Sequence, residues 1–308
     1  MQPVQELESV QVPEIRNLLP VSVIIPTRNE ARNLPRCLDS LRDVAEVYVV
    51  DSQSTDATPE IARQSGAKVV QFYYHGGWPK KRQWALDTLP LAAEWVLLLD
   101  ADEVLTAELV DEIRRAIQSG NQEGYYIALE MHFLGRPLRH SDASFQKLSL
   151  FRRGHGRFEC RLQDQNASMG DMEVHEHVIV NGRIGKLKNR VIHHNVNSLS
   201  DYIHKHNEYS NWEARVLHKP KSAEELQAKF FGRQAQRRRW LRKRFLGFPG
   251  SPMYFFFYKY FLRLGFLDGV PGLIYCCLQA IQFFHIKAKF YELRKAEAKS
   301  RACAESPA

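Results

Sequence analysis

The chain has 308 residues, and its 43 Lys and Arg against 35 Asp and Glu give a formal charge of +8. With 44% hydrophobic and 25% charged residues, the composition excludes a globally disordered chain and allows a sizeable buried core. The five cysteines are an odd number without CxxC spacing, which argues against a disulfide scaffold or a zinc ribbon and favours a reducing compartment. We expect neither a signal peptide nor an ordinary transmembrane helix, because the first residues lack basic and apolar regions and no unbroken apolar run reaches about 18 residues.

The positive charge is concentrated in one segment near the C-terminus. Between Glu225 and Asp268 there are ten Lys and Arg residues and no acidic residue, so the rest of the chain sums to −2. Aromatic residues gather in the same part, because 15 of the 34 Phe, Tyr and Trp fall in residues 245–291. We therefore expect a lead-in at 1–20, a sheet-forming domain at 21–195, and a helical, basic and aromatic region at 196–308.

Short apolar runs alternate with helical spacing over the first 120 residues. Strands are predicted at 21–25, 46–50, 68–72 and 95–99. Helices are predicted at 30–42, 55–65, 84–89 and 106–119, and Gly66 and Gly120 stand where two of them end. This alternation is typical of an α/β fold with a mostly parallel, Rossmann-like sheet.

The rest of the chain has a different pattern. Residues 121–195 look mixed, with strand-like runs at 125–131 and 174–180, and the chain after Ser198 looks mostly helical. In open parallel sheets, ligands bind outside the carboxyl ends of the strands. Those ends carry the polar segments 27–30, 51–52 and 100–103, which are therefore the candidate site.

Asp100 and Asp102 form a DxD pair after a predicted buried strand. Alternate residues of an extended segment share a face, so both carboxylates can reach one hard cation. A divalent ion there could bridge a diphosphate and offset the charge on a departing nucleoside diphosphate. The alternative is a helix start enriched in acids, with Thr106 as its cap.

Asp51 ends another predicted strand and begins the turn 51–56. Its carboxylate can accept a hydrogen bond from an imide N–H of a base or from ribose hydroxyls. The alternative is ordinary turn chemistry, in which Asp and Ser side chains bond to their own backbone.

Three segments in this order carry a resemblance to a known family: V-S-V-I-I-P-T-R-N-E, V-V-D-S-x-S-T-D-x-T and L-L-L-D-A-D-E. Together they resemble the family 2 glycosyltransferases, which have the GT-A fold. The match is strong over residues 21–117 and looser beyond. Within the family, G-W-P-K-K-R-Q-W-A-L at 77–86 and G-F-L-D-G-x-P-G at 265–272 are most similar to bacterial lipopolysaccharide core β-1,4-glucosyltransferases.

The resemblance implies which residues hold the nucleotide sugar. The positions that match the motif around the base and ribose are Pro26, Thr27, Asn29 and Glu30. Asp51, followed by Ser52, matches the acid that recognises the base, and Asp100 matches the DxD member at the ribose and diphosphate. Lys80 and Arg82 match basic positions that face the donor, and their chemistry suits phosphate. The alternative for both is ordinary solvated charge.

The resemblance also implies a base and a metal site. Inverting members use a carboxylate to deprotonate the acceptor hydroxyl, and the V-H-E match selects Glu176, with Asp171 and Glu173 as open alternatives. Asp102 and a late histidine, for which we select His194 over His193, match ligands of Mg²⁺ or Mn²⁺. The alternative for these residues is acceptor positioning, turn capping or a paired histidine without a ligand.

The basic and aromatic C-terminal region predicts a partner of its own. Lys and Arg can meet anionic head groups while aromatic side chains lie at their level. Residues 270–286 could dip into a bilayer, although Gln279, Gln282 and His285 argue against spanning. Nucleic acid is the competing partner, which we do not expect, and an aromatic core covering the sheet domain is the third interpretation. A Q-x-x-R-W match at 236–240 is interpreted as accidental.

These expectations combine into one function. The enzyme would be an inverting, metal-dependent hexosyltransferase that moves glucose by preference, from UDP-glucose, to a glycolipid or lipopolysaccharide-core acceptor. It would be cytoplasmic and peripheral on the inner face of the cell membrane. One alternative is a nucleotidyltransferase of sugar metabolism, which the missing Gly-rich, Lys-containing phosphate loop opposes. Another is a catalytically silent membrane-binding or nucleic-acid-binding protein, which the presence of both Asp100 and Asp102 opposes.

Overall fold

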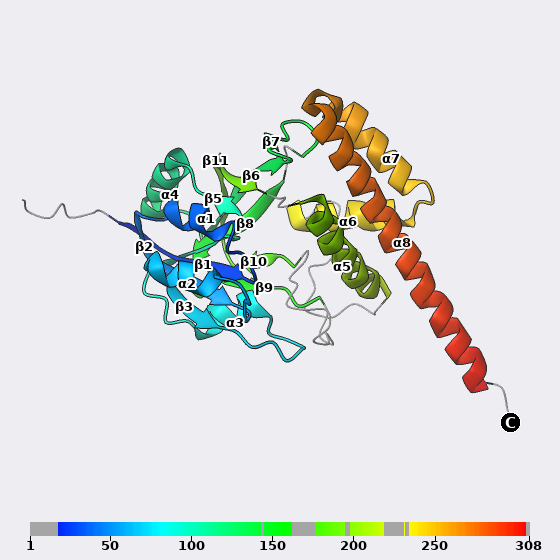
Figure 1. Cartoon of the computed structure of the whole chain (residues 1–308), viewed down its shortest axis with the longest axis horizontal. Coiled ribbons are helices and arrows are strands. Elements are labelled where there is room, and N and C mark those ends of the chain that lie inside the picture. Colours follow the sequence, from blue (N-terminus) through cyan, green and yellow to red (C-terminus); the bar gives the residue numbers. More distant parts are fainter. Residues whose placement is uncertain are drawn as a thin grey trace, which may run out of the picture.

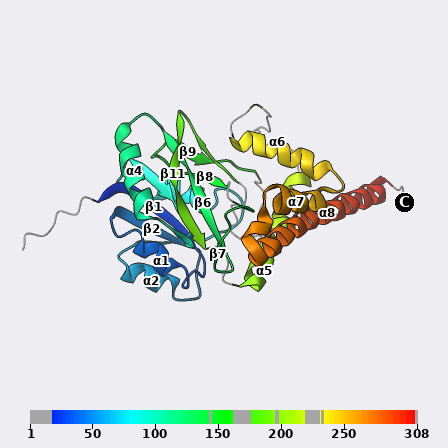
Figure 2. The same ribbon diagram turned by 90° about the horizontal axis from the view of Figure 1, so that it is seen from above.

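The computed structural model describes residues 18–142, 145–161, 176–194, 198–218, 231 and 234–305. It has two parts that lie side by side in both views (Figures 1 and 2). We call residues 18–194 the sheet region and residues 198–305 the helical region.

One mixed sheet forms the centre of the sheet region, in the strand order β3-β2-β1-β4-β8-β6-β11-β5, with β7 paired to β6. Its strands are β1 (Leu19–Thr27), β2 (Val44–Asp51), β3 (Lys68–Gln71), β4 (Trp95–Leu98), β5 (Glu103–Val104), β6 (Gly124–Phe133), β7 (Arg136–Pro137), β8 (Gln146–Arg152) and β11 (Ile184–His194). The first four are parallel, β8 is antiparallel to both of its neighbours, and β11 runs parallel to β6. A separate antiparallel pair joins β9 (Gly156–Phe158) to β10 (Val178–Val180).

Helices cover both faces of this sheet (Figure 1). The first core contains side chains from α1 (Leu34–Asp39), α2 (Thr58–Gln64) and α4 (Ala107–Ser119). The second core contains side chains from α3 (Lys81–Thr88) and from the β9–β10 pair. Alternate residues of the central strands divide between the two cores, as Val23 and Ile24 of β1 do.

The predicted elements of the first 120 residues are present, with shifted ends. The helix expected at 30–42 is shorter, because residues 31–33 form a turn and α1 begins at Leu34. The cap of α4 is confirmed, since the Thr106 side chain accepts from Leu109 N at 3.2 Å. Gly66 and Gly120 have φ angles of +80° and +67°, the left-handed conformation that ends a helix. Residues 174 and 175 of the predicted run 174–180 lie outside the described residues, and β10 supplies its end.

The helical region consists of helices, as expected. It contains α5 (Leu199–His218), α6 (Gln234–Gly247), α7 (Ser251–Phe257), a π turn (Tyr258–Leu262), a 3₁₀ turn (Gly265–Asp268) and α8 (Gly269–Glu305). α8 packs along α5 and α7, and its C-terminal part extends away from the sheet region in both views (Figures 1 and 2).

The segment 265–272 joins the two regions. The Asp268 carboxylate accepts hydrogen bonds from the backbone N–H groups of Arg139, His140 and Ser141 at 2.8–3.2 Å. A Cβ at Gly272 would lie 2.4 Å from the Gly265 carbonyl oxygen, so the close packing of this segment requires glycine there. The G-F-L-D-G-x-P-G motif therefore docks the helical region onto the sheet region.

One helical stretch differs from the sequence expectation about membrane spans. Gly265–Lys299 is long and apolar enough to cross a bilayer by length and composition, with mean hydropathy 1.3 in its most apolar window. Its polar residues interrupt the apolar run, but they do not lower the mean hydropathy enough to exclude a membrane span. A third of that window is buried within the protein, and Gln279 donates to Tyr202 of α5 at 2.9 Å, so part of α8 serves as a packing partner of α5.

Candidate functional site

The carboxyl ends of β1 and β2 lie next to each other, with Thr27 opposite Asp51 in the register of the sheet. Hydrogen bonds from side chains join the two loops that follow these strands. Asn29 has a φ of +55°, accepts from Thr55 N at 2.8 Å, and donates its own N–H to Ser54 Oγ at 2.8 Å. Pro26 and Thr27 at the end of β1 thus lie beside the loops that carry Asn29 and Ser52, and Ser52 donates its N–H to the Thr27 carbonyl.

Asp51, the last residue of β2, is fully buried. Its carboxylate accepts from Thr27 Oγ1 at 3.2 Å, from Ser54 N at 3.0 Å and from Gln71 Nε2 at 3.0 Å, and it also bonds the Ser54 hydroxyl. This is the turn chemistry that the sequence left open as an alternative. For Asp51 to recognise a base, one of these hydrogen bonds would have to break.

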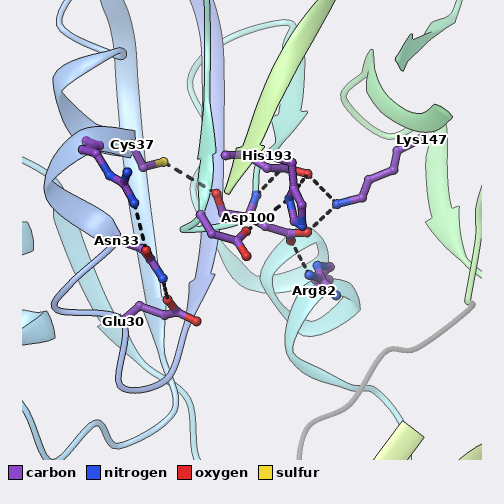
Figure 3. Close-up of polar contacts among 10 residues, drawn as sticks. Glu30, Asn33, Cys37, Arg82, Asp100, Lys147 and His193 are labelled. Carbon is purple, nitrogen blue, oxygen red and sulfur yellow. Dashed lines mark hydrogen bonds and ion pairs between the residues drawn. The ribbon is translucent and has the colours of Figure 1, made fainter. Parts of the chain in front are cut away.

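Asp100 lies between two cations just beyond the end of β4 (Figure 3). Arg82 Nη2 reaches one carboxylate oxygen at 2.5 Å, and Lys147 from β8 bonds the other. Lys147 also bonds Glu103 Oε1 at 2.6 Å, and Glu103 in turn accepts from Asp100 N at 2.9 Å. Burial would raise the pKa of Asp100, but the charges of Lys147 and Arg82 more than offset this and hold the pKa well below its usual range.

Asp102, the second acid of the pair, meets His193 rather than His194. His193 Nδ1 lies 3.4 Å from Asp102 Oδ1 and 3.4 Å from Glu103 Oε1. His194 donates its backbone N–H to the Asp102 carbonyl at 2.9 Å, while its ring packs 5.1 Å from that of His132. Neighbouring residues of a strand point to opposite faces, so the two imidazoles cannot both face the Asp102 carboxylate.

The donor atoms at Asp102 fit a divalent cation shared with a substrate. Among the described residues, no group of three or more His, Cys, Asp and Glu is arranged around one point. Mg²⁺, however, commonly takes one or two protein ligands and completes its shell with substrate phosphates and water. His193 Nδ1 is buried and makes no hydrogen bond of good geometry, so it and Asp102 Oδ1 offer two ligand atoms.

Glu30 and Lys205 complete the charged surroundings. Burial is the largest cause that raises the pKa of Glu30, and Asp102 and Asp100 raise it further. The pKa of Lys205, on α5, is raised by Tyr209 and also by the negative charge of Asp102 and Glu30. The helical region therefore brings a cation to the acidic strand ends.

Glu176, the predicted base, is buried in an ion pair. Lys80 Nζ bonds its Oε2 at 2.9 Å, and both side chains are fully buried. Arg161 N lies 3.4 Å from the other oxygen. Lys80 is thus not a solvated charge, and Arg82 alone of the predicted pair reaches the DxD acids. The alternatives Asp171 and Glu173 lie outside the described residues.

Sequence reasoning missed Lys147, Glu103 and Lys205, and it chose His194 over His193. Glu103 directly follows the DxD pair, but nothing in its sequence context distinguishes it from a helix-start acid. Lys147 is the one charged side chain in the strand-like run 146–151, which was a usable signal. Lys205 comes from a helix whose distance from the site the sequence could not give.

Comparisons with known proteins identify the family. The model described as Glycosyl transferase family 2 matches residues 22–174. An uncharacterized glycosyltransferase of Rickettsia felis is 30% identical over 204 residues, which cover 64% of this chain and 70% of that relative. The chain belongs to glycosyltransferase family 2. Its mixed sheet, with the DxD segment after β4, is the GT-A fold that the resemblance implied.

Other likenesses extend over more of this glycosyltransferase. The lipopolysaccharide core biosynthesis glycosyltransferase LpsC of Rhizobium meliloti is 26% identical over 289 residues, covering 89% of this chain and 93% of that relative. The crystal structure of S. aureus TarS 1–349 in complex with UDP-GlcNAc has a TM-score of 0.45 and 20% identity, covering 90% of this chain and 92% of that one. At that TM-score the likeness carries no residue roles to this chain.

Proposed function

We propose that this family 2 glycosyltransferase transfers a hexose, with glucose favoured, from a nucleotide diphosphate sugar such as UDP-glucose to a glycolipid or lipopolysaccharide-core acceptor. One observation carries the proposal. Lys80 and Arg82, two residues apart at the start of α3, reach Glu176 and Asp100 respectively. The candidate base and the DxD acids therefore lie around the same helix end, as a donor sugar between them would require.

The charges of the site suit departure of a nucleoside diphosphate. In the transfer, the bond between the anomeric carbon and the diphosphate oxygen breaks, the acceptor oxygen bonds to that carbon, and the hydroxyl proton passes to the base. Arg82 and Lys147 can turn from Asp100 to diphosphate oxygens, because guanidinium and ammonium groups bind both kinds of oxyanion. Asp102 and His193 would hold a divalent ion, which when bound adds positive charge at the diphosphate.

Glu176 is assigned as the base. Lys80 fixes its Oε2, and proton transfer requires an acceptor hydroxyl to come within hydrogen-bond distance of the carboxylate. Glu176→Gln should reduce sugar transfer by about 10²–10⁴-fold while leaving donor affinity nearly unchanged, since a base acts on the acceptor proton. If that variant transfers normally and Glu173→Gln or Asp171→Asn does not, the base is one of the latter two.

A donor screen tests the function itself. Purified protein with Mg²⁺ or Mn²⁺ is incubated with a panel of nucleotide sugars, and binding and release of the nucleoside diphosphate are measured. The proposal requires selective binding and slow hydrolysis of one nucleotide diphosphate sugar, with UDP-glucose expected first. Absence of binding to every member of the panel would contradict it.

The membrane is the proposed location of the acceptor. An apolar surface, which we call the apolar face, is exposed on α7, the two turns after it and the start of α8; it comprises Met253, Tyr254, Phe257, Tyr258, Phe261, Leu262, Leu264, Phe266, Leu267 and Val270. Leu262 is 71% exposed and Val270 is 69% exposed, and the ten exposed apolar side chains fall within the segment 253–270. This surface fits the interfacial region of a bilayer on the cytoplasmic side, where soluble nucleotide sugars are available.

The anchor differs from the one expected from charge alone. Arg242 lies 3.4 Å from the buried Glu213, and Lys259 bonds Asp142 at 2.8 Å, so these two basic residues serve the fold. Arg237 and Arg244 are exposed, whereas the side chains of Arg238 and Arg239 lie outside the described residues. We therefore assign most of the membrane affinity to the apolar face.

A further inference from the structure

Two adjacent residues of α5 enter the sheet region beside Glu176. Trp212 is fully buried and Glu213 is 2% exposed, although both belong to the helical region. Lys80 Nζ lies 5.2 Å from the centre of the Trp212 ring, and the Arg161 guanidinium lies 5.1 Å from it. One indole therefore stabilises two cations from different parts of the sheet region.

Those two cationic residues also contact the Glu176 carboxylate. Lys80 bonds Glu176 Oε2 at 2.9 Å, and the Arg161 backbone N–H lies 3.4 Å from Glu176 Oε1. Both residues thus contact Trp212 as well as Glu176. Displacement of the ring would act directly on the Lys80 ammonium, and on the Arg161 backbone through the Arg161 side chain.

Glu213 links the same cluster to the basic helix α6. Its Oε2 lies 3.6 Å from Arg161 Nη1, and its Oε1 lies 3.4 Å from Arg242 Nε. A buried carboxylate between two guanidinium groups is costly to desolvate, and simple core packing does not require it. The arrangement instead fixes the guanidinium of Arg161 over the Trp212 ring.

We propose that Trp212 and Glu213 are positioning residues for Glu176, so that the helical region completes the base site of the sheet region. This inference rests on the proposed role of Glu176 as base. It predicts that damage to the Trp212–Glu213 pair slows transfer to the acceptor without weakening donor binding, because the proposed donor contacts, at the ends of β1, β2 and β4 and at Arg82, Lys147 and His193, do not include this pair.

The test uses the full chain with UDP-glucose as donor and a truncated lipopolysaccharide-core glycolipid in detergent as acceptor. Glu213→Gln keeps the shape of the side chain and removes its charge. We expect a loss of about 10–100-fold in kcat for transfer, an unchanged KM for the donor and unchanged donor hydrolysis, as a displaced catalytic group would produce. The matched control is Glu112→Gln on α4. The Glu112 carboxylate accepts hydrogen bonds from the backbone N–H groups of Lys188 and Asn189 in β11.

Trp212 supplies a second test if Glu213→Gln does not fold. Trp212→Leu should lose transfer, whereas Trp212→Phe, which keeps a ring face for the two cations, should recover most of it. Equal transfer by the Leu and Phe variants, or a Glu213→Gln variant that behaves like Glu112→Gln, would overturn the inference.

The Glu176→Gln background separates this inference from the proposed function. If Glu213 acts through Glu176, adding Glu213→Gln to Glu176→Gln changes transfer no further. If Glu176→Gln alone transfers normally, the base assignment is wrong and the positioning claim fails with it. If Glu176→Gln slows transfer and adding Glu213→Gln slows it by the same further factor as in the wild type, the base stands and the positioning claim is overturned.

Discussion

The sheet region and the helical region differ in their most distinctive side chains, which are paired charged groups in the first and exposed apolar groups in the second. In the sheet region, charged groups at the strand ends form ion pairs, as Asp100 does with Arg82 and Lys147. In the helical region, large apolar side chains such as Phe257 and Leu262 are left exposed. The difference fits the proposal that the first region binds a charged ligand and the second contacts an apolar surface.

The largest expected effect is on stability and concerns Lys80. Because both Lys80 and Glu176 are fully buried, Lys80→Met removes a charge partner from a carboxylate in the interior. Such a loss should lower the free energy of unfolding by about 3–5 kcal/mol. Chemical denaturation measures it, with Lys68→Met as the control, since the Lys68 side chain is exposed and Glu46 keeps its hydrogen bonds from Ser22 and Ala92 N, so the loss should be smaller. Similar midpoints for the two variants would show that the Lys80 pair is not a structural element.

The apolar face offers the second test, in which the expected effect is on membrane binding and not on stability. Phe257, Phe261 and Leu262 are exposed, so changing each to Ser should leave the unfolding midpoint nearly unchanged. Binding to anionic vesicles should weaken by at least about tenfold, because each side chain that enters a bilayer contributes about 1.5–3 kcal/mol when fully buried. Sedimentation with vesicles at low and high salt measures this.

The matched comparison for that test replaces Arg237 and Arg244 with Gln. Their effect should be smaller and should disappear at high salt, because exposed charges are screened over about 8–10 Å at moderate ionic strength. If the Arg variant loses more vesicle binding than the apolar variant, the charge-based anchor is correct and the apolar face is not the main contact.

A further expected effect concerns the junction between the two regions. Burial would raise the pKa of Asp268, but hydrogen bonds from Ser141 and His140 more than offset this and lower it below its ordinary 3.8. A lowered folded-state pKa stabilises the protein above about pH 4, and that contribution is lost as the pH falls through the folded-state value. Asp268→Asn should cost about 1.5–3 kcal/mol at neutral pH and weaken the acid dependence of unfolding. Equal acid sensitivity in wild type and variant would contradict this.

The sequence predicted the features that depend on local pattern. The strands and the acids at their ends follow from apolar runs closed by Asp51 and Asp100, and the helix ends follow from Gly66 and Gly120. The partners of those acids did not follow, because Lys147 reaches Asp100 from a strand placed beside β4 only by the folded sheet. A run of basic residues likewise gives no sign that Lys80 is buried while Arg82 is partly exposed.

The direct measurement is UDP release from UDP-glucose by wild type and Asp102→Asn, with Mg²⁺ or Mn²⁺ present. Asp102 follows the end of β4 and lies 3.4 Å from His193, so the isosteric change should leave the fold intact. Loss of one charge-stabilising group at a reacting centre should reduce turnover by about 10²–10³-fold. The control Asp39→Asn, in an exposed pair with Arg42, should turn over like wild type. Equal UDP release by Asp102→Asn and wild type would contradict the account of where this glycosyltransferase performs its chemistry.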